Sequence, residues 1–173
     1  MLIMLLTISQ AIYWMKIKII CVGKIKESFY RDALSEYVKR LSRYATIEIC
    51  EVADEKTPDR LSDTERDLIL AKEGERIKSK IKDSDYLITL EIEGNKLSSE
   101  GLASKLDSLF NSGVSSIAFV IGGSLGIDKS IKKAASFSIS FSDMTFPHQL
   151  MRVILLEQIY RAFKINAHEP YHK

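Results

Sequence analysis

The residues that could do chemistry lie in three short segments, and the most informative of these is rich in glycine. Gly122, Gly123 and Gly126 directly follow the apolar run of residues 117–121 and precede a short helix that Asp128 begins. Glycine lets the backbone bend sharply and lets a ligand approach the chain with no side chain in between. After a strand, such a segment is typical of a site that binds a ligand through backbone groups, although these glycines alone would also fit a plain turn.

Two further segments follow predicted strands and are suited to line the same site. They are residues 90–94 and residues 142–146. Ligands bind at the carboxyl ends of the strands in a parallel α/β sheet, so we expect the three segments to converge in one pocket. Such a pocket would offer backbone donors and acceptors, apolar walls and few charges. This combination suits a ligand with a flat base and a sulfonium better than one with several phosphates.

The common nucleotide-binding motifs are absent from the sequence. No G-x-x-x-x-G-K-[ST] loop is present, and the glycines of residues 122–126 follow the fourth predicted strand without G-x-G-x-x-G spacing. The bend after the first strand, residues 22–26, lacks the hydroxyl-rich phosphate loop of a flavodoxin and the acidic cluster of a receiver domain. These classes of site are therefore excluded.

Ionisable and aromatic side chains gather near the carboxyl terminus. His148 is predicted in the first turn of the last helix, where the helix dipole favours a neutral imidazole that either accepts a proton or caps the helix. Arg161 could act on a substrate or simply pair with Glu157 four residues earlier. Tyr171 and His172 belong to a tail that could stack on RNA, although a chain terminus is more often frayed.

Short apolar runs alternate with segments of helical periodicity, and these elements must position the candidate residues. Strands are predicted over residues 16–22, 46–52, 86–91, 116–121 and 137–141, and helices over residues 27–44, 62–80, 99–110, 128–135 and 147–164. Ser62 and Glu65 form a capping box before the second helix, and Gly94 with Asn95 is a predicted turn after the third strand. This alternation indicates an α/β fold, a mostly parallel sheet flanked by helices, in one domain over residues 15–173.

The last predicted helix is apolar on nearly every side. Its residues Glu157, Gln158 and Arg161 form a narrow polar stripe, with Arg152 on the opposite side. A helix of this kind must be covered on more than one face. We therefore predict a homodimer that is built partly on this helix.

Bulk properties are those of an ordinary globular protein. The chain has 173 residues and a net charge of +2, which permits contact with RNA without indicating it. Cys21 and Cys50 lie in apolar strands and are interpreted as buried thiols. Neither a disulfide framework nor a metal site is expected, and a reducing cytoplasm fits this composition.

Residues 1–14 are apolar but fit no targeting class. They lack the basic start and the cleavage site of a signal peptide, and they fall short of the roughly 20 residues of a membrane span. Met15 is a natural start for the first strand. We interpret residues 1–14 as an extension that arises from an upstream start and lies outside the core domain; the alternative is an extra strand or helix packed on the body.

The sequence resembles the ribosomal RNA large subunit methyltransferase H family, which belongs to the SPOUT class of knotted methyltransferases. The resemblance covers residues 15–173 and is carried by residues 141–152, 157–163 and 171–173, with shorter matches at residues 22–24, 90–92 and 121–123. It implies a trefoil-knotted α/β fold, a homodimer, S-adenosylmethionine as methyl donor, and N3 of a pseudouridine in 23S rRNA as acceptor. Because no separate RNA-binding module is visible, we expect the ribosome to present this target.

The resemblance also assigns roles to single residues. The implied cofactor contacts are Leu90, Gly122, Phe141, Ser142, Asp143, Met144, Thr145 and Phe146, which lie in the three segments already selected. Arg161, Tyr171 and His172 are tied to substrate binding or catalysis, with His148 as a further candidate. Two other functions stay open: a related SPOUT enzyme with a different RNA target, and a nucleotide-binding dimer without catalytic activity.

Overall fold

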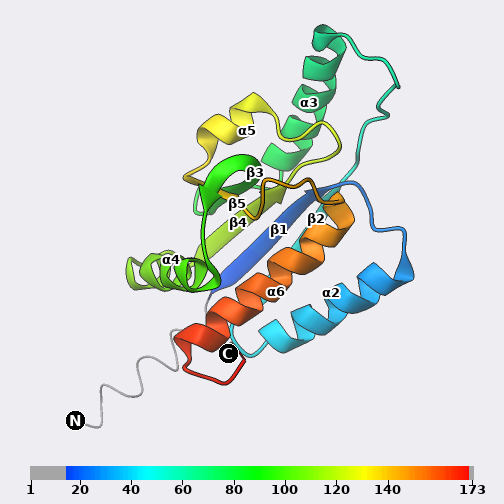
Figure 1. Cartoon of the computed structure of the whole chain (residues 1–173). Helices are drawn as coiled ribbons and strands as arrows, with labels where there is room; N and C mark the ends of the chain where they lie inside the picture. Colours follow the sequence, from blue (N-terminus) through cyan, green and yellow to red (C-terminus); the bar gives the residue numbers. More distant parts are fainter. Residues whose placement is uncertain (1–14, 172–173) are drawn as a thin grey trace, which may run out of the picture.

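A sheet of five parallel strands forms the centre of the computed structural model, which describes residues 15–171 (Figure 1). The strands lie in the order β2-β1-β4-β3-β5 and are β1 (Lys16–Val22), β2 (Thr46–Val52), β3 (Tyr86–Lys96), β4 (Ser116–Ile121) and β5 (Phe137–Ser140). The helices are α2 (Ser28–Leu41), α3 (Asp63–Lys78), α4 (Ser99–Asn111), α5 (Lys129–Ala134) and α6 (His148–Asn166). The predicted α/β architecture with a parallel sheet is confirmed.

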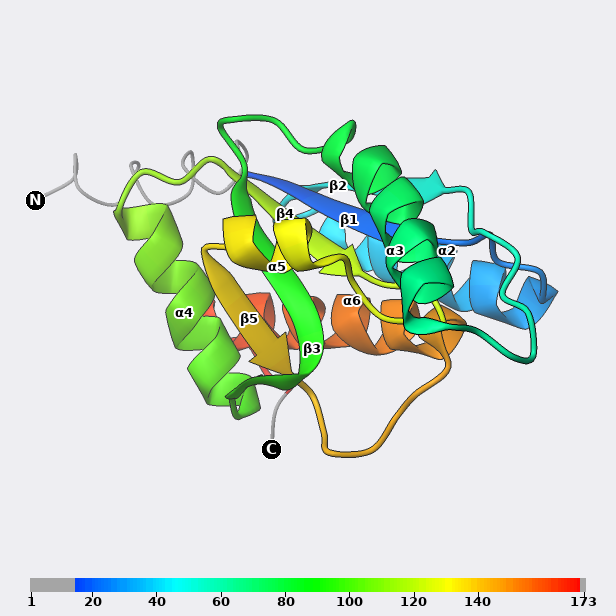
Figure 2. The same cartoon turned by 90° about the horizontal axis from the view of Figure 1, so that it is seen from above.

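Helices cover both faces of the sheet in two groups. α2, α4 and α6 lie on one face, and α3 with α5 lies on the other (Figures 1 and 2). Side chains alternate along a strand, so Ile17 and Ile19 of β1 pack under the first group, whereas Ile20 and Val22 pack under the second. β1 and β4 lie inside the sheet and are buried on both faces, which explains the apolar run of β4 and of residues 19–22 in β1. Lys18 of β1 is buried as well, and its ammonium pairs with Asp85 at 2.7 Å.

β3 is longer than predicted, and the turn expected at Gly94 and Asn95 is wrong. Asn95 pairs with Ile139 of β5, and the register between the two strands shifts over residues 91–94. A Cβ atom on Gly94 would come within 2.6 Å of the carbonyl carbon of Ile139, so this glycine permits a close approach of two strands. A glycine in a strand and a glycine in a turn look alike in sequence, and only the pairing with β5 separates them.

The predicted helix boundaries agree with the structure to within a few residues. The capping box of α3 is present, because the Ser62 hydroxyl accepts a hydrogen bond from the Glu65 amide and the Glu65 carboxylate accepts one from the Ser62 amide. α2 ends early, at Leu41, where a turn returns the chain to the sheet and the Tyr44 amide donates to the Leu41 carbonyl at 2.8 Å.

None of the helices within residues 15–171 is both long and apolar enough to cross a membrane. The interpretation of residues 1–14 as an extension concerns a segment outside the described residues. The structure therefore bears on the proposed core domain only.

Candidate active site at the carboxyl edge of the sheet

A cavity of about 560 Å³ lies at the carboxyl edge of the sheet. Its wall contains residues 90–93 of β3, residues 121–127 after β4, and most of residues 141–146 between β5 and α6. The predicted convergence of three strand ends in one pocket is therefore confirmed. It follows from the parallel pairing of β3 with both β4 and β5, which brings these three carboxyl ends to the same edge.

Residues 122–126 form a tight turn in the cavity wall. The Gly126 amide donates to the Gly123 carbonyl at 3.1 Å, and these two residues form a short antiparallel bridge. A Cβ atom on Gly122 would overlap the carbonyl group of Gly126, so a larger residue here would force the turn open. The glycine requirement therefore comes from the shape of the cavity wall.

The segment between β5 and α6 supplies another part of the wall. The predicted cofactor contacts that line the cavity are Leu90, Gly122, Phe141, Ser142, Met144, Thr145 and Phe146. Asp143 is not among the lining residues: its carboxylate accepts a hydrogen bond from Lys96 Nζ at 2.6 Å, and its side chain is 79% exposed. Its predicted contact with the cofactor is therefore not supported by the shape of the cavity.

The cavity wall also contains an ion pair that sequence reasoning did not single out. Glu91 Oε2 lies 2.9 Å from Lys132 Nζ, and Glu91 Oε1 accepts a hydrogen bond from the Thr89 hydroxyl at 2.6 Å. Glu91 belonged to a segment already predicted to line the pocket. Nothing in the sequence indicated that Lys132, on the short helix α5, would reach β3, because that contact depends on how α5 packs on the sheet.

His148 lies in the first turn of α6, as predicted, and its half-buried side chain lines the cavity. Burial lowers the pKa of His148, and the positive charge of Arg152 lowers it further, while Asp54 and Glu27 act in the opposite direction. Since the net effect is a pKa below its ordinary value, the imidazole is neutral near pH 7. A neutral imidazole in a cavity wall can accept a proton or a hydrogen bond from a ligand.

Arg161 and Tyr171 form a second cluster, outside the cavity. Arg161 Nε donates to Glu157 Oε1 at 3.0 Å, which is the pairing considered as an alternative to a role in substrate binding. The Arg161 guanidinium lies over the ring of Tyr171 at 4.9 Å from its centroid, and the Tyr171 hydroxyl donates to the same Glu157 oxygen at 3.2 Å. Burial, together with the hydroxyl of Tyr37, raises the pKa of Tyr171 to about 12, so this phenol stays protonated.

The two clusters are separated along α6. Arg161 follows His148 by thirteen residues on one helix, which corresponds to about 20 Å along its axis. His172, the remaining predicted catalytic residue, lies outside the described residues. One chain therefore places His148 at the cavity and holds Arg161 and Tyr171 away from it.

Residues 15–171 were also compared with the requirements of a metal site and of a reactive thiol. This part of the chain contains no group of three histidine, cysteine or acidic side chains that could hold a metal ion. Cys21 is fully buried, and burial raises its pKa to about 12. Its thiol is therefore protonated and a poor nucleophile, in agreement with the interpretation of a buried thiol. Cys50, interpreted in the same way, is only partly buried, so its predicted burial is wrong; burial and the hydrogen bond with Glu48 raise the pKa of its thiol.

Comparison with known proteins identifies the family. A family model described as "Predicted SPOUT methyltransferase" matches residues 15–172. Proteins named ribosomal RNA large subunit methyltransferase H, from Bifidobacterium animalis and Bifidobacterium adolescentis, are 59% and 60% identical over 159 residues, which is 92% of this chain and all of each relative. The relative of that name from Streptococcus equi is 55% identical over the same share of both chains.

Solved structures support the fold at much lower identity. A structure titled "Probable Methyltransferase" from Bordetella pertussis matches with a TM-score of 0.54 and 11% identity, over 89% of this chain and 98% of the other. A probable methylase family protein from Haemophilus influenzae matches with a TM-score of 0.52 and 13% identity, over 91% and 70% of the two chains. The family match over residues 15–172 and the high identity to full-length relatives show that this chain belongs to the ribosomal RNA large subunit methyltransferase H family of SPOUT methyltransferases.

Proposed function

We propose that this protein transfers a methyl group from S-adenosylmethionine to N3 of a pseudouridine in 23S rRNA of the large ribosomal subunit. The observation that carries this proposal is the cavity that three strand ends form in a chain of this family. The names of the relatives supply the class of acceptor, large-subunit ribosomal RNA. Acting on ribosomes would place the protein in the cytoplasm.

The residues of the cavity fit the proposed donor. S-adenosylmethionine, when bound, supplies a methyl group on a positively charged sulfonium. A cavity of about 560 Å³ lies within the usual range for a small-molecule site. Leu90 and Phe141 offer apolar surface for a flat base, and the turn at Gly122 offers backbone groups.

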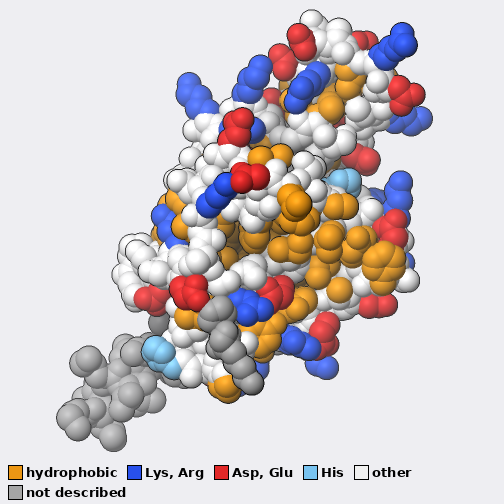
Figure 3. Space-filling model, in the orientation of Figure 1, with side chains coloured by type: hydrophobic (Ala, Val, Ile, Leu, Met, Phe, Trp, Pro, Cys, Tyr) orange, Lys and Arg blue, Asp and Glu red, His pale blue; other side chains and the backbone are white. Residues whose placement is uncertain are grey.

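We also propose that the active form is a homodimer built on α6. Leu150, Val153 and Ile154 are half-exposed on this helix, although they are apolar. Figure 3 shows apolar side chains gathered over the middle of this face of the molecule, with charged side chains around them. Two copies that pack these surfaces together would bury apolar area that a single chain leaves in contact with water.

A dimer of this kind would unite the two clusters. Leu150, Ile154 and Arg161 follow one another at helical spacing on the same side of α6. A two-fold axis near Ile154 with antiparallel helices would bring Arg161 and Tyr171 of one chain beside the cavity of its partner. Each site would then combine a donor cavity with its own His148 and the carboxyl-terminal residues of the second chain.

The chemistry assigned to these residues follows from the acceptor. N3–H of pseudouridine is a weakly acidic imide that must lose its proton, and the nitrogen must be aligned with the methyl carbon. Arg161, oriented by Glu157, stabilises the negative charge that develops on the uracil carbonyl groups, and Tyr171 stacks on the base. His148 or His172 accepts the proton, directly or through water.

The deciding experiment incubates the purified protein and labelled S-adenosylmethionine with ribosomes that lack the modification. We expect one methyl group per large subunit, and mass spectrometry of the rRNA should place it on N3 of a pseudouridine. A methyl group on another nucleotide or on tRNA would establish a related SPOUT enzyme instead. Donor binding without transfer to any RNA would favour the non-catalytic nucleotide-binding dimer. Equal rates on protein-free rRNA would contradict presentation of the target by the ribosome.

A further inference from the structure

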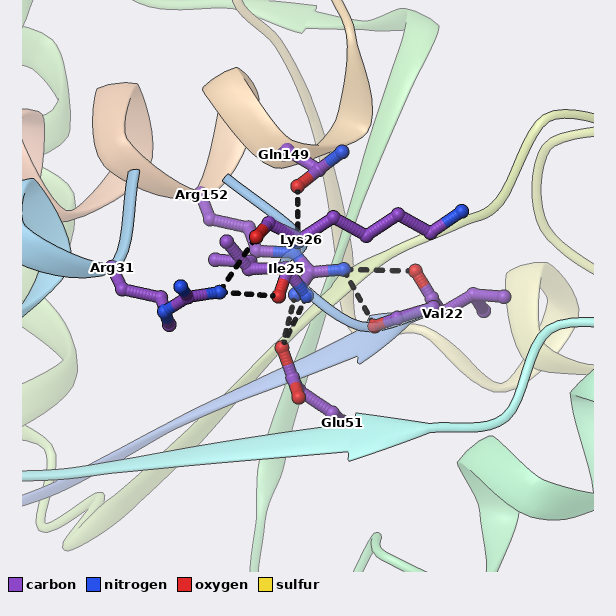
Figure 4. A network of polar contacts seen from close by, with 8 residues as sticks. Val22, Ile25, Lys26, Arg31, Glu51, Gln149 and Arg152 are labelled. Atoms are coloured by element: carbon purple, nitrogen blue, oxygen red, sulfur yellow. Dashed lines mark hydrogen bonds and ion pairs between the residues drawn. The ribbon is translucent and has the colours of Figure 1, made fainter. Parts of the chain in front are cut away.

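Arg152 is the largest fully buried side chain among the described residues, with an exposed fraction of 1%. Its Nη1 donates to Glu51 Oε1 at 2.7 Å, and its Nη2 donates to the carbonyl oxygens of Val22 and Gly23 at 2.9 and 2.8 Å (Figure 4). Nε has no hydrogen-bond partner within residues 15–171. Burial of a charged group is costly, and a buried ion pair is by itself weak evidence of stabilisation. A reason for burying Arg152 is therefore sought in the segment to which it is bonded.

That segment is the loop of residues 22–26, which several other contacts hold as well. The Ile25 amide donates to Glu51 Oε1 at 3.1 Å, so one carboxylate oxygen accepts from both the loop and Arg152. The Lys26 amide donates to Gln149 Oε1 at 3.0 Å. In Figure 4 the side chains of Gln149 and Arg152 reach the loop from α6, and Glu51 reaches it from β2. The loop is thereby attached to the first turns of α6.

His148 lies on these same turns and faces the loop. A Cβ atom on Gly23 would lie 3.6 Å from His148 Nε2, which is an ordinary van der Waals distance, so the imidazole faces Gly23 with room for about one methyl group between them. Gly23 has a φ of +83°, a conformation in which a side chain would be strained. Arg152 fixes this backbone by holding the Gly23 carbonyl, and it lies one helical turn after His148. The guanidinium thus fixes the stretch of backbone that the imidazole faces.

The charges around His148 come from three elements. Arg152 belongs to the same helix, Lys26 and Glu27 lie at the end of the loop after β1, and Asp54 follows β2. Arg152 and Lys26 favour the neutral imidazole, whereas Asp54 and Glu27 favour the protonated form. Removal of the Arg152 guanidinium would take away one of the two positive charges that lower the pKa of His148, so this pKa would rise.

We propose that Arg152 is a positioning residue for methyl transfer: by fixing the loop of residues 22–26, it holds the imidazole of His148 in the wall of the donor cavity. Arg152 is not among the residues that line the cavity, so it acts through the loop and the helix that it joins. This inference rests on the proposed function, because it assigns His148 to the site of that reaction.

Two substitutions separate the bonds of Arg152 from its charge. Arg152→Lys keeps the charge but lacks the planar fork that reaches three acceptors, and Arg152→Met lacks both. We expect both to lower kcat about 10- to 100-fold, as for other small displacements of a reacting group. Donor affinity, measured by calorimetry, should change by less than about threefold, because the three strand-end segments that would hold the donor are intact.

The pH dependence gives a readout that a loss of stability would not move. In Arg152→Met, the acid limb of the kcat profile and the NMR titration of the His148 ring should both shift to higher pH, because a positive charge is gone. In Arg152→Lys, both should stay near the wild-type pH while kcat remains low.

The matched control is Lys18→Met. Lys18 is another fully buried cation, paired with Asp85 at 2.7 Å, but none of its hydrogen-bond partners belongs to the cavity wall. We expect a lower melting temperature with wild-type kcat. If Arg152→Met does not fold, Arg152→Lys and Gln149→Ala, which removes only the bond to Lys26, complete the test.

The inference is overturned if the Arg152 variants lose no more kcat than Lys18→Met, or if their donor binding is lost. The titration of His148 and the binding of the donor need no RNA. If the wild-type protein methylates no ribosome, the proposed function fails, and an unshifted His148 titration in Arg152→Met would separately reject the positioning role.

Discussion

Two inactive variants should restore activity to each other if every active site is built from two chains. Arg161→Ala keeps the donor cavity but loses the guanidinium that would serve the partner's site. Gly122→Val keeps Arg161 but damages the cavity, because its Cβ atom would overlap the Gly126 carbonyl and lie 2.8 Å from Ile127 Cγ1. In a mixed dimer, the intact cavity of the first chain would face the intact arginine of the second.

The structure sets the expected magnitudes. Loss of a group that stabilises developing charge costs about 100- to 1,000-fold in turnover, or about 2.7–4 kcal/mol. Overpacking of the turn by Gly122→Val should lower the stability of the fold by about 1–3 kcal/mol, and by more where the new atoms overlap backbone atoms, as they do here. Random exchange makes half of the dimers mixed, and each mixed dimer has one complete site. The mixture should therefore reach about 25% of the wild-type turnover, far above either variant alone.

The assay measures labelled methyl transfer to unmodified ribosomes before and after the two variants exchange subunits, with different tags to isolate mixed dimers. A mixture of Arg161→Ala with Arg161→Gln is the control, because it can form no complete site. Mixed dimers that are no more active than the sum of their parents would refute the two-chain site. Activity would then have to arise within one chain, in spite of the separation of about 20 Å along α6.

Three further outcomes are expected. Ile154→Arg places a charge in the proposed dimer surface at a half-exposed position; the variant should sediment as a folded monomer with little turnover, and a stable dimer would reject this surface. Because the pKa of His148 is lowered from the ordinary histidine value of about 6.5, turnover should be constant above pH 6.5 and should fall only as the pH drops through the lowered pKa. His148→Gln should remove this acid limb from the rate profile, whereas an unchanged limb would point to His172. Lys18→Met leaves the buried carboxylate of Asp85 without its cation, and the free energy of unfolding in urea should fall by about 3 kcal/mol. An unchanged free energy of unfolding would mean that the ion pair stabilises the fold no more than an apolar side chain does.

Much of the fold could be predicted from local patterns. The continuous apolar run of β4 and the capping box of α3 each depend on a few neighbouring residues, and both are present as predicted. The convergence of the three strand ends also followed, since parallel strands connected by helices place their carboxyl ends on one edge. The neutral state of His148 was predicted from the helix dipole, but the structure attributes it first to burial.

The errors and omissions share one cause. The strand pairing at Asn95, the contact of Lys132 with Glu91, and the engagement of Asp143 by Lys96 all join residues that are distant in sequence. Periodicity and propensity describe the near neighbours of a residue, so they carry no information about such partners. The same limit applies to Arg152, which stood out in sequence only as a polar residue on an apolar helix and proves to hold a loop more than 100 residues away.

The sequence by itself determined the kinds of elements, their order, the edge of the sheet at which a ligand would bind, and the family, because these depend on local composition and on specific motifs. The tertiary structure decided which side chains meet: it placed His148 in the cavity wall, facing Gly23, and held Arg161 about 20 Å further along α6. The physical reason is that burial and helix length depend on residues that are close in sequence, whereas the partners of a charged group depend on how whole helices and strands pack together. That separation within one chain is what makes a second chain necessary to the proposed site.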